Sequence, residues 1–193
     1  MSCGMIQPYA YLKNFAPKVV NLFQAEDDDL MFQGLKRHIA EVRRCFDYPG
    51  IPYHDANVED ESKRFNRYCW HNLPVLTEIH HSEWLKDKLS DCISIELKPS
   101  YSFLSLYGPE GVCPLHTDRP QCQVTIDLCV DLDDLWPIYV NDNEYNLKPG
   151  EALIYSGTHH PHYRKPMRES TLATFCNMAF FHFVPLNYMG PLS

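Results

Sequence analysis

The spacing of apolar residues changes once along the 193-residue chain, near residue 93, and this change limits the fold more than any other feature. Before it, apolar residues recur every three or four positions, which is the period of an amphipathic helix. After it, the period becomes two, as in Ile93, Ile95 and Leu97, which is typical of strands with one buried face. The sequence therefore predicts helices followed by strands.

Two helical stretches precede the change. The first contains Leu35, Ile39, Val42 and Phe46 and follows the acidic run 27–29, which suits a helix N-terminus. The second runs from about residue 73 to 89. Residues 47–72 between them lack either period and predict a long loop, with one helical turn as an option.

Short strands separated by turn signals fill the second half of the chain. We expect them at residues 93–98, 101–107, 114–118, 122–130, 136–141, 144–147, 151–156 and 171–184. Helices followed by many short strands indicate a mainly β protein with a double-stranded β-helix core, of the jelly-roll or cupin-like kind, and supporting N-terminal helices. Residues 1–193 are then one domain, with helical support and the loop in 1–92 and the β-barrel core in 93–184.

Composition narrows the classes of function. The formal net charge of −8 argues against general nucleic-acid binding, which needs a basic surface. No apolar run is long enough to cross a membrane, and the first residues lack the pattern of a signal peptide. The eight cysteines contain no C-x-x-C pair, so buried free thiols are favoured over disulfides. We expect a cytoplasmic protein without nucleic-acid or membrane partners.

A metal site is the strongest chemical signal. His116 and Asp118 lie in a predicted strand, where residues two apart share a face and can reach one ion. A single H-x-D triplet is expected from composition alone, so its context matters. The similar run 81–83 lies in a predicted helix, where residues two apart diverge, and is interpreted as a surface feature. A histidine after the strand at 151–156 would complete the two-histidine, one-carboxylate set of non-haem Fe(II) oxygenases.

Three segments of the second half resemble the Fe(II)/2-oxoglutarate-dependent dioxygenase superfamily, and within it the prolyl-4-hydroxylase-like proteins. They are YGPEGVCPLHTDRPQCQVTIDLCVDLDDLWPIYV, LKPGEALIYSGTHHPHYRKP and AFFHFV, within residues 101–184. The resemblance implies that His116, Asp118 and His162 hold Fe(II). His162 is chosen because Tyr155 to Arg164 is similar to the pattern Y-x-G-x(4)-H-x-R, and His160 remains the alternative.

The same resemblance implies a cosubstrate and a reaction. Relatives bind the far carboxylate of 2-oxoglutarate through a basic residue beyond the distal histidine, here Arg164 or, as second choice, Arg168. Tyr107 matches a tyrosine that contacts the cosubstrate. The implied enzyme uses Fe(II), 2-oxoglutarate and O2, with ascorbate as an optional reductant. It hydroxylates an unactivated C–H bond of a small amino-acid-like metabolite or a peptidyl residue and releases succinate and CO2. Because Asp118 supplies the carboxylate that halogenases lack, hydroxylation is favoured.

Two further classes stay open at this point. A metal-containing, cupin-like binding or sensing module would use the same ligands without turnover, and a zinc hydrolase would act without oxygen. The basic residues Lys63, Arg64 and Arg67 could line a substrate entrance, but a loop that packs onto the barrel is the favoured interpretation.

Overall fold

The computed structural model describes residues 8–23, 30–47, 58–71 and 73–192, and of 44–47 it describes the backbone only. The helices are α1 (Pro8–Lys13), α2 (Leu30–Asp47), α3 (Ser62–Phe65), α4 (Pro74–His80), α5 (Glu83–Ser90) and α6 (Met167–Ser170). The strands of the first half are β1 (Lys18–Asn21), β2 (Val58–Asp60) and β3 (Arg67–His71). Those of the second half are β4 (Leu97–Tyr107), β5 (Cys113–His116), β6 (Val124–Leu132), β7 (Ile138–Val140), β8 (Asn143–Tyr145), β9 (Glu151–Tyr155), β10 (His162–Arg164) and β11 (Cys176–Pro185).

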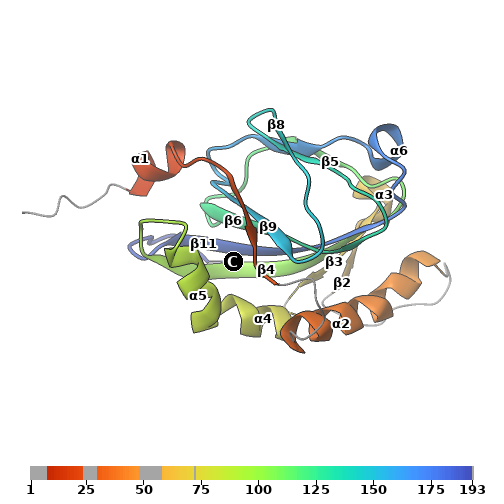
Figure 1. Ribbon diagram of the computed structural model, residues 1–193, viewed down its shortest axis with the longest axis horizontal. Coiled ribbons are helices and arrows are strands. Elements are labelled where there is room, and N and C mark those ends of the chain that lie inside the picture. The colour runs from red at the N-terminus through yellow and green to blue at the C-terminus, as the bar shows by residue number, and fades with distance from the viewer. Residues whose placement is uncertain (1–7, 24–29, 48–57, 72, 193) are drawn as a thin grey trace, which may run out of the picture.

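The strands form two antiparallel sheets that face each other. The larger sheet has the order β1-β9-β6-β11-β4-β3-β2, and the smaller has the order β5-β10-β7-β8. Helices α2, α4 and α5 cover the outer face of the larger sheet, and the smaller sheet lies over its inner face (Figure 1). The result is a β-barrel with helical support on one side.

Strand β6 shows how the period of two builds both sides of this barrel. Val124, Ile126 and Leu128 point outward into the core under the helices. The alternate residue Cys129 belongs to a second core between the sheets, and Thr125 and Asp127 line a cavity there. Each fully buried apolar side chain contributes about 1.5 to 3 kcal/mol. The larger sheet is therefore apolar outward and carries polar residues inward.

Helix α2 confirms the first predicted helix. Leu35, Ile39 and Val42 are buried against the larger sheet, as their spacing predicts. The acidic run 27–29 and the side chain of Phe46 lie outside what the structure describes.

The second predicted helix is wrong as a single element, because it is divided into α4 and α5. Ser82 adopts extended backbone angles, and its hydroxyl accepts a hydrogen bond from the Leu85 N–H, as a helix N-cap does. The run 81–83 is therefore a helix junction rather than the interior of a helix. His81 and Glu83 are exposed, as expected of a surface feature.

The predicted loop at 47–72 is wrong where the structure describes it. The four-residue α3 agrees with the optional helical turn, but β2 and β3 were not predicted. Strand β3 pairs with β4 along its whole length. Neighbouring strands stabilise it, and the period of the segment alone does not reveal such tertiary pairing. Strand β1, which pairs with β9, went unnoticed for the same reason. The first 92 residues thus supply strands as well as helices to the fold.

Strand boundaries in the second half differ from the prediction in several places, and β5 ends at His116 rather than at residue 118. The predicted strand 93–98 is wrong over its first residues, because the Ile93 N–H donates to Leu89 O and closes α5. Strand β4 then runs without interruption from Leu97 to Tyr107, although a break between two strands was expected at residues 99–100. The three-residue strand β10 was not predicted, and β11 begins only at Cys176. The predicted mainly β architecture with helical support is otherwise confirmed.

Two expectations from composition can be compared with the structure. Among the helices of the described residues, none is long and apolar enough to cross a membrane. The cysteines of the described residues are free thiols, and Cys69, Cys122, Cys129 and Cys176 are buried. Cys3 and Cys45 lie outside this description.

Candidate active site

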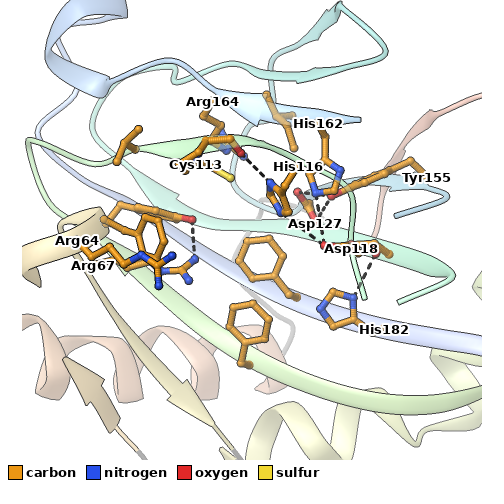
Figure 2. Close-up of a pocket in the computed structure, with 18 of the residues that line it drawn as sticks. Arg64, Arg67, Cys113, His116, Asp118, Asp127, Tyr155, His162, Arg164 and His182 are labelled. Carbon is orange, nitrogen blue, oxygen red and sulfur yellow. Dashed lines mark hydrogen bonds and ion pairs between the residues drawn. The ribbon is translucent and has the colours of Figure 1, made fainter. Parts of the chain in front are cut away.

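A cavity of about 400 Å³ opens between the two sheets (Figure 2). His116, Asp118 and His162 form one wall. The guanidinium-bearing residues Arg64, Arg67 and Arg164 line other parts, and aromatic residues of β4 and β11 form the floor. The volume lies at the lower end of the roughly 300 to 1,000 Å³ typical of ligand pockets.

Strand pairing brings the two histidines together although they are 46 residues apart in sequence. His116 ends β5, and it is directly opposite His162 in the ladder between β5 and β10. Their ring centroids are 4.2 Å apart. The Nε2 atom of each ring lies 3.6 Å from Oδ1 of Asp118. Three ligand atoms thus converge within 4.8 Å of one another, as a metal site requires.

Backbone carbonyls fix the orientation of both rings. His116 Nδ1 lies 2.7 Å from Pro114 O, and His162 Nδ1 lies 2.9 Å from His160 O. A carbonyl accepts, so each Nδ1 carries the proton and donates. In the neutral rings Nε2 is then left with its lone pair toward Asp118, which is the arrangement that metal-binding histidines adopt.

Asp118 is held from two sides. Its backbone N–H donates to Gly157 O at 2.8 Å, and its Oδ2 accepts from Thr125 Oγ1 at 2.9 Å. A Cβ atom at Gly157 would overlap Oδ2 and lie 2.5 Å from Thr125 Oγ1, so this position accommodates only glycine. Because Oδ2 is engaged by Thr125, Oδ1 is the oxygen that faces the histidines.

The electrostatics of the three residues favour a cation between them. Burial opposes ionisation of Asp118, but the close contacts with His116 and His162 outweigh it and hold the pKa of this carboxyl well below its usual range. The same contact with Asp118 raises the pKa of His116 to about 11. A metal ion bound between these residues would compete with the proton of His116 and release it.

Arg164 is a buried cation inside the barrel. Its Nη1 donates to Trp136 O and its Nη2 to Met178 Sδ at 3.7 Å, while the guanidinium lies 4.9 Å from the centroid of the Trp136 ring. No carboxylate of the described residues forms an ion pair with it. Asp127, which is also buried, interacts with Arg164 electrostatically without forming an ion pair. A buried charge without a direct ion-pair partner is costly, so an anionic ligand would stabilise this arrangement.

The other two residues predicted to bind the cosubstrate differ in position. Tyr107 is buried, lines the cavity and accepts a hydrogen bond from Arg67 Nη1 at 3.0 Å. Arg168 is exposed, forms an ion pair with Glu110 at 2.5 Å and does not line the cavity. The geometry therefore favours Arg164 over Arg168 as a ligand-binding residue.

The neighbouring histidines lie outside the convergent set. His159 Nδ1 interacts with the hydroxyls of Ser156 and Thr158, at 2.9 and 3.0 Å. His160 is buried, and its Nδ1 accepts from the backbone N–H of Ser156 at 3.4 Å. Neither histidine lines the cavity, whereas His162 does. This difference favours His162 over His160 as the distal metal ligand.

Several residues of the cavity were not predicted as site residues from the sequence. Thr125 lies between Asp118 and His182, whose Nδ1 is 3.2 Å from the hydroxyl. Asp127 is fully buried, which raises its pKa to about 6, and the Tyr155 hydroxyl donates to it at 3.3 Å. The signal was present in β6, where Thr125 and Asp127 interrupt an apolar run at spacing two.

Comparison with solved structures identifies the fold. HygX from Streptomyces hygroscopicus, solved with nickel, 2-oxoglutarate and hygromycin B, superposes with a TM-score of 0.61 over 94% of this chain and 88% of its own, at 9% identity. A 2OG-Fe(II) oxygenase family protein from Burkholderia pseudomallei superposes with a TM-score of 0.62 over 95% of this chain and 91% of its own, at 14% identity. A prolyl-4-hydroxylase from Pseudomonas putida superposes with a TM-score of 0.56 over 91% of this chain and 98% of its own, at 13% identity.

The chain therefore has the jelly-roll fold of the Fe(II)/2-oxoglutarate oxygenases, and the predicted double-stranded β-helix is confirmed. No protein-family model matches the sequence, and no curated protein does. At this level of identity the likeness establishes the fold, while the chemistry must be argued from the site.

Proposed function

We propose that the protein is an Fe(II)- and 2-oxoglutarate-dependent dioxygenase that hydroxylates its substrate. The observation that carries this proposal is the convergence of His116, Asp118 and His162, with both Nδ1 atoms bonded to backbone carbonyls. Imidazole and carboxylate in this combination suit ferrous iron and leave coordination positions for other ligands. With 2-oxoglutarate and O2, the metal supplies the oxidising power for C–H hydroxylation, with release of succinate and CO2.

The protein's own residues have three tasks in this proposal. His116, Asp118 and His162 hold the metal, while Thr125 orients the carboxylate. Arg164, with Tyr107 nearby, binds the far carboxylate of 2-oxoglutarate, because its buried charge has no ion-pair partner among the described residues. The barrel walls exclude water from the reacting atoms.

The substrate and the setting are proposed more broadly. HygX binds 2-oxoglutarate and the small molecule hygromycin B, which supports a small-molecule substrate over a nucleic acid. A peptidyl residue is the second choice. The free thiols agree with a cytoplasmic location, and ascorbate would serve only as an auxiliary reductant.

An anaerobic titration of the metal-free protein tests the proposal. We expect Fe(II) followed by 2-oxoglutarate to produce the weak visible charge-transfer absorption of a chelated 2-oxoacid, and neither alone to do so. The band should be lost in His162→Ala and in Asp118→Ala. It should persist in His159→Ala, the matched control from the same segment.

Two results would refute parts of this assignment. Tight Fe(II) binding without a band would identify a metal-containing module that does not turn over. A band that survives His162→Ala but disappears in His160→Ala would assign the distal ligand to the other histidine.

A further inference from the structure

We propose that the cavity selects a small organic acid as substrate. The carboxylate of this acid is bound by Arg64, an exposed lining residue that marks the mouth of the cavity, and its apolar body lies on the aromatic residues of β4 and β11. This inference rests on the proposed oxygenase function, because it assigns the substrate class of the same site. It follows from the distribution of aromatic rings, charges and free hydrogen-bonding groups around the cavity.

The aromatic floor consists of Tyr101, Phe103, Phe180 and His182. Phe103 and Phe180 are opposite each other in the ladder between β4 and β11, with ring centroids 4.7 Å apart. Tyr101 lies 4.6 Å from the ring of His182. Tyr101, Phe103 and Phe180 are only partly buried, so the cavity exposes a continuous apolar surface beside Asp118.

The floor offers a ligand few polar partners. The Tyr101 hydroxyl accepts from Arg119 at 2.8 Å and lies 3.1 Å from Cys122 Sγ. His182 Nδ1 lies 3.2 Å from the Thr125 hydroxyl. Its Nε2 has no partner among the described residues, but this atom is buried and is not exposed to a ligand in the cavity. A polyhydroxylated ligand would lose hydrogen bonds to water here without replacing them, which is costly. An apolar ligand body meets no such penalty.

Charge at the mouth is unbalanced in favour of an anion. Arg67 is paired with Glu61 and donates to the Tyr107 hydroxyl, so it is already neutralised. Arg64 is exposed, lies 4.6 Å from the centroid of the Phe65 ring and forms no ion pair with a described residue. The chain as a whole has a net charge of −8, which makes a free cation at the mouth distinctive.

The positions of the arginines and of the metal ligands also determine how a bound molecule is oriented in the cavity. Arg64 and Arg67 lie on one side of the cavity, and His116, Asp118 and His182 lie on the other (Figure 2). A carboxylate at Arg64 would therefore direct the other end of the molecule over the floor toward the metal ligands. Because 2-oxoglutarate would occupy part of the 400 Å³, the remainder suits a small molecule.

Three probes with one carbon skeleton test the inference: 3-phenylpropionate, 3-phenylpropionamide and 3-phenylpropylamine. Each is titrated anaerobically into the protein loaded with Fe(II) and 2-oxoglutarate, and binding is measured from the shift of the charge-transfer band. We expect the acid to bind about tenfold more tightly than the amide, as one charge-assisted contact provides, and the amine to bind most weakly.

Variants on helix α3 assign the effect to one residue. Arg64→Gln should weaken binding of the acid about tenfold and leave the amide unchanged. Lys63→Gln, which removes a neighbouring positive charge that does not line the cavity, should change neither. Arg64→Glu should reverse the order, so that the amine binds more tightly than the acid.

Equal affinity for acid and amide would overturn the inference, and so would an unchanged acid affinity in Arg64→Gln. Disappearance of the band on addition of the acid would also overturn it, since the acid would then have displaced 2-oxoglutarate. Absence of the band before any probe is added is a different failure, that of the proposed function. Ligand-detected NMR then measures the same three affinities without iron.

Discussion

Replacing Thr125 by valine should weaken Fe(II) binding about 10- to 100-fold, although Thr125 is not a ligand. The hydroxyl donates to Asp118 Oδ2 at 2.9 Å and is buried, so water cannot replace it. Valine keeps the branched shape but removes the donor, which frees the carboxylate to rotate away from His116 and His162.

The magnitude follows from what the hydroxyl does. A 10- to 100-fold loss corresponds to about 1.4 to 2.7 kcal/mol, because a tenfold change costs 1.36 kcal/mol. The variant also leaves His182 Nδ1, now 3.2 Å from the hydroxyl, without an acceptor. A buried group left without its partner costs about 1 to 3 kcal/mol of folding free energy. Metal affinity and stability should therefore fall together.

Anaerobic competition against a coloured Fe(II) chelator measures the affinity, and thermal unfolding of the metal-free protein measures the stability. Thr125→Ser is the matched control, because it removes a methyl group and keeps the donor. It should retain most of the affinity. Wild-type affinity in Thr125→Val, or equal losses in both variants, would refute the role of the hydroxyl.

Three more predictions concern the site and the core. Gly157→Ala should abolish Fe(II) binding in the chelator competition, because its Cβ would overlap Asp118 Oδ2; retained binding would contradict this geometry. Arg164→Met should weaken 2-oxoglutarate binding at least about tenfold by calorimetry, and Arg168→Met should not, since only Arg164 is buried in the cavity; equal effects would contradict that distinction. Burial lowers the pKa of His80 to about 3 from 6.5, so the unfolded chain binds its proton first as the pH falls. Stability should decrease from pH 6.5 toward 3, and His80→Leu should show a smaller decrease in urea unfolding across that range; an unchanged slope would exclude His80 as its source.

The parts of the fold that follow from the sequence are those with a clear period. Leu35, Ile39 and Val42 predicted α2, and alternation predicted most strands of the barrel. Local geometry was sufficient in these cases, because each pattern reflects the side of one element that is buried. It was not sufficient for His116 and Asp118, which were expected on one face of a single strand: β5 ends at His116, and Asp118 lies beyond it.

The elements that depend on distant partners could not be predicted in this way. Strand β3 exists because β4 pairs with it, and β10 is only three residues long. Helix α3 and β3 contribute Arg64 and Arg67 to the cavity, whereas the predicted loop was expected to pack onto the barrel. Their basic residues were noticed in the sequence, but which of them line the cavity depends on pairing with β4.

The site depends on closure of the barrel, because its residues are held by both sheets. His116 and His162 are adjacent through a ladder of the smaller sheet. Asp118 is bound instead by Gly157, just after β9, and by Thr125 of β6, both at the larger sheet. Neither sheet alone would bring the three ligand atoms together. The metal site therefore requires contact between the two sheets, so changes that separate the sheets should remove the site.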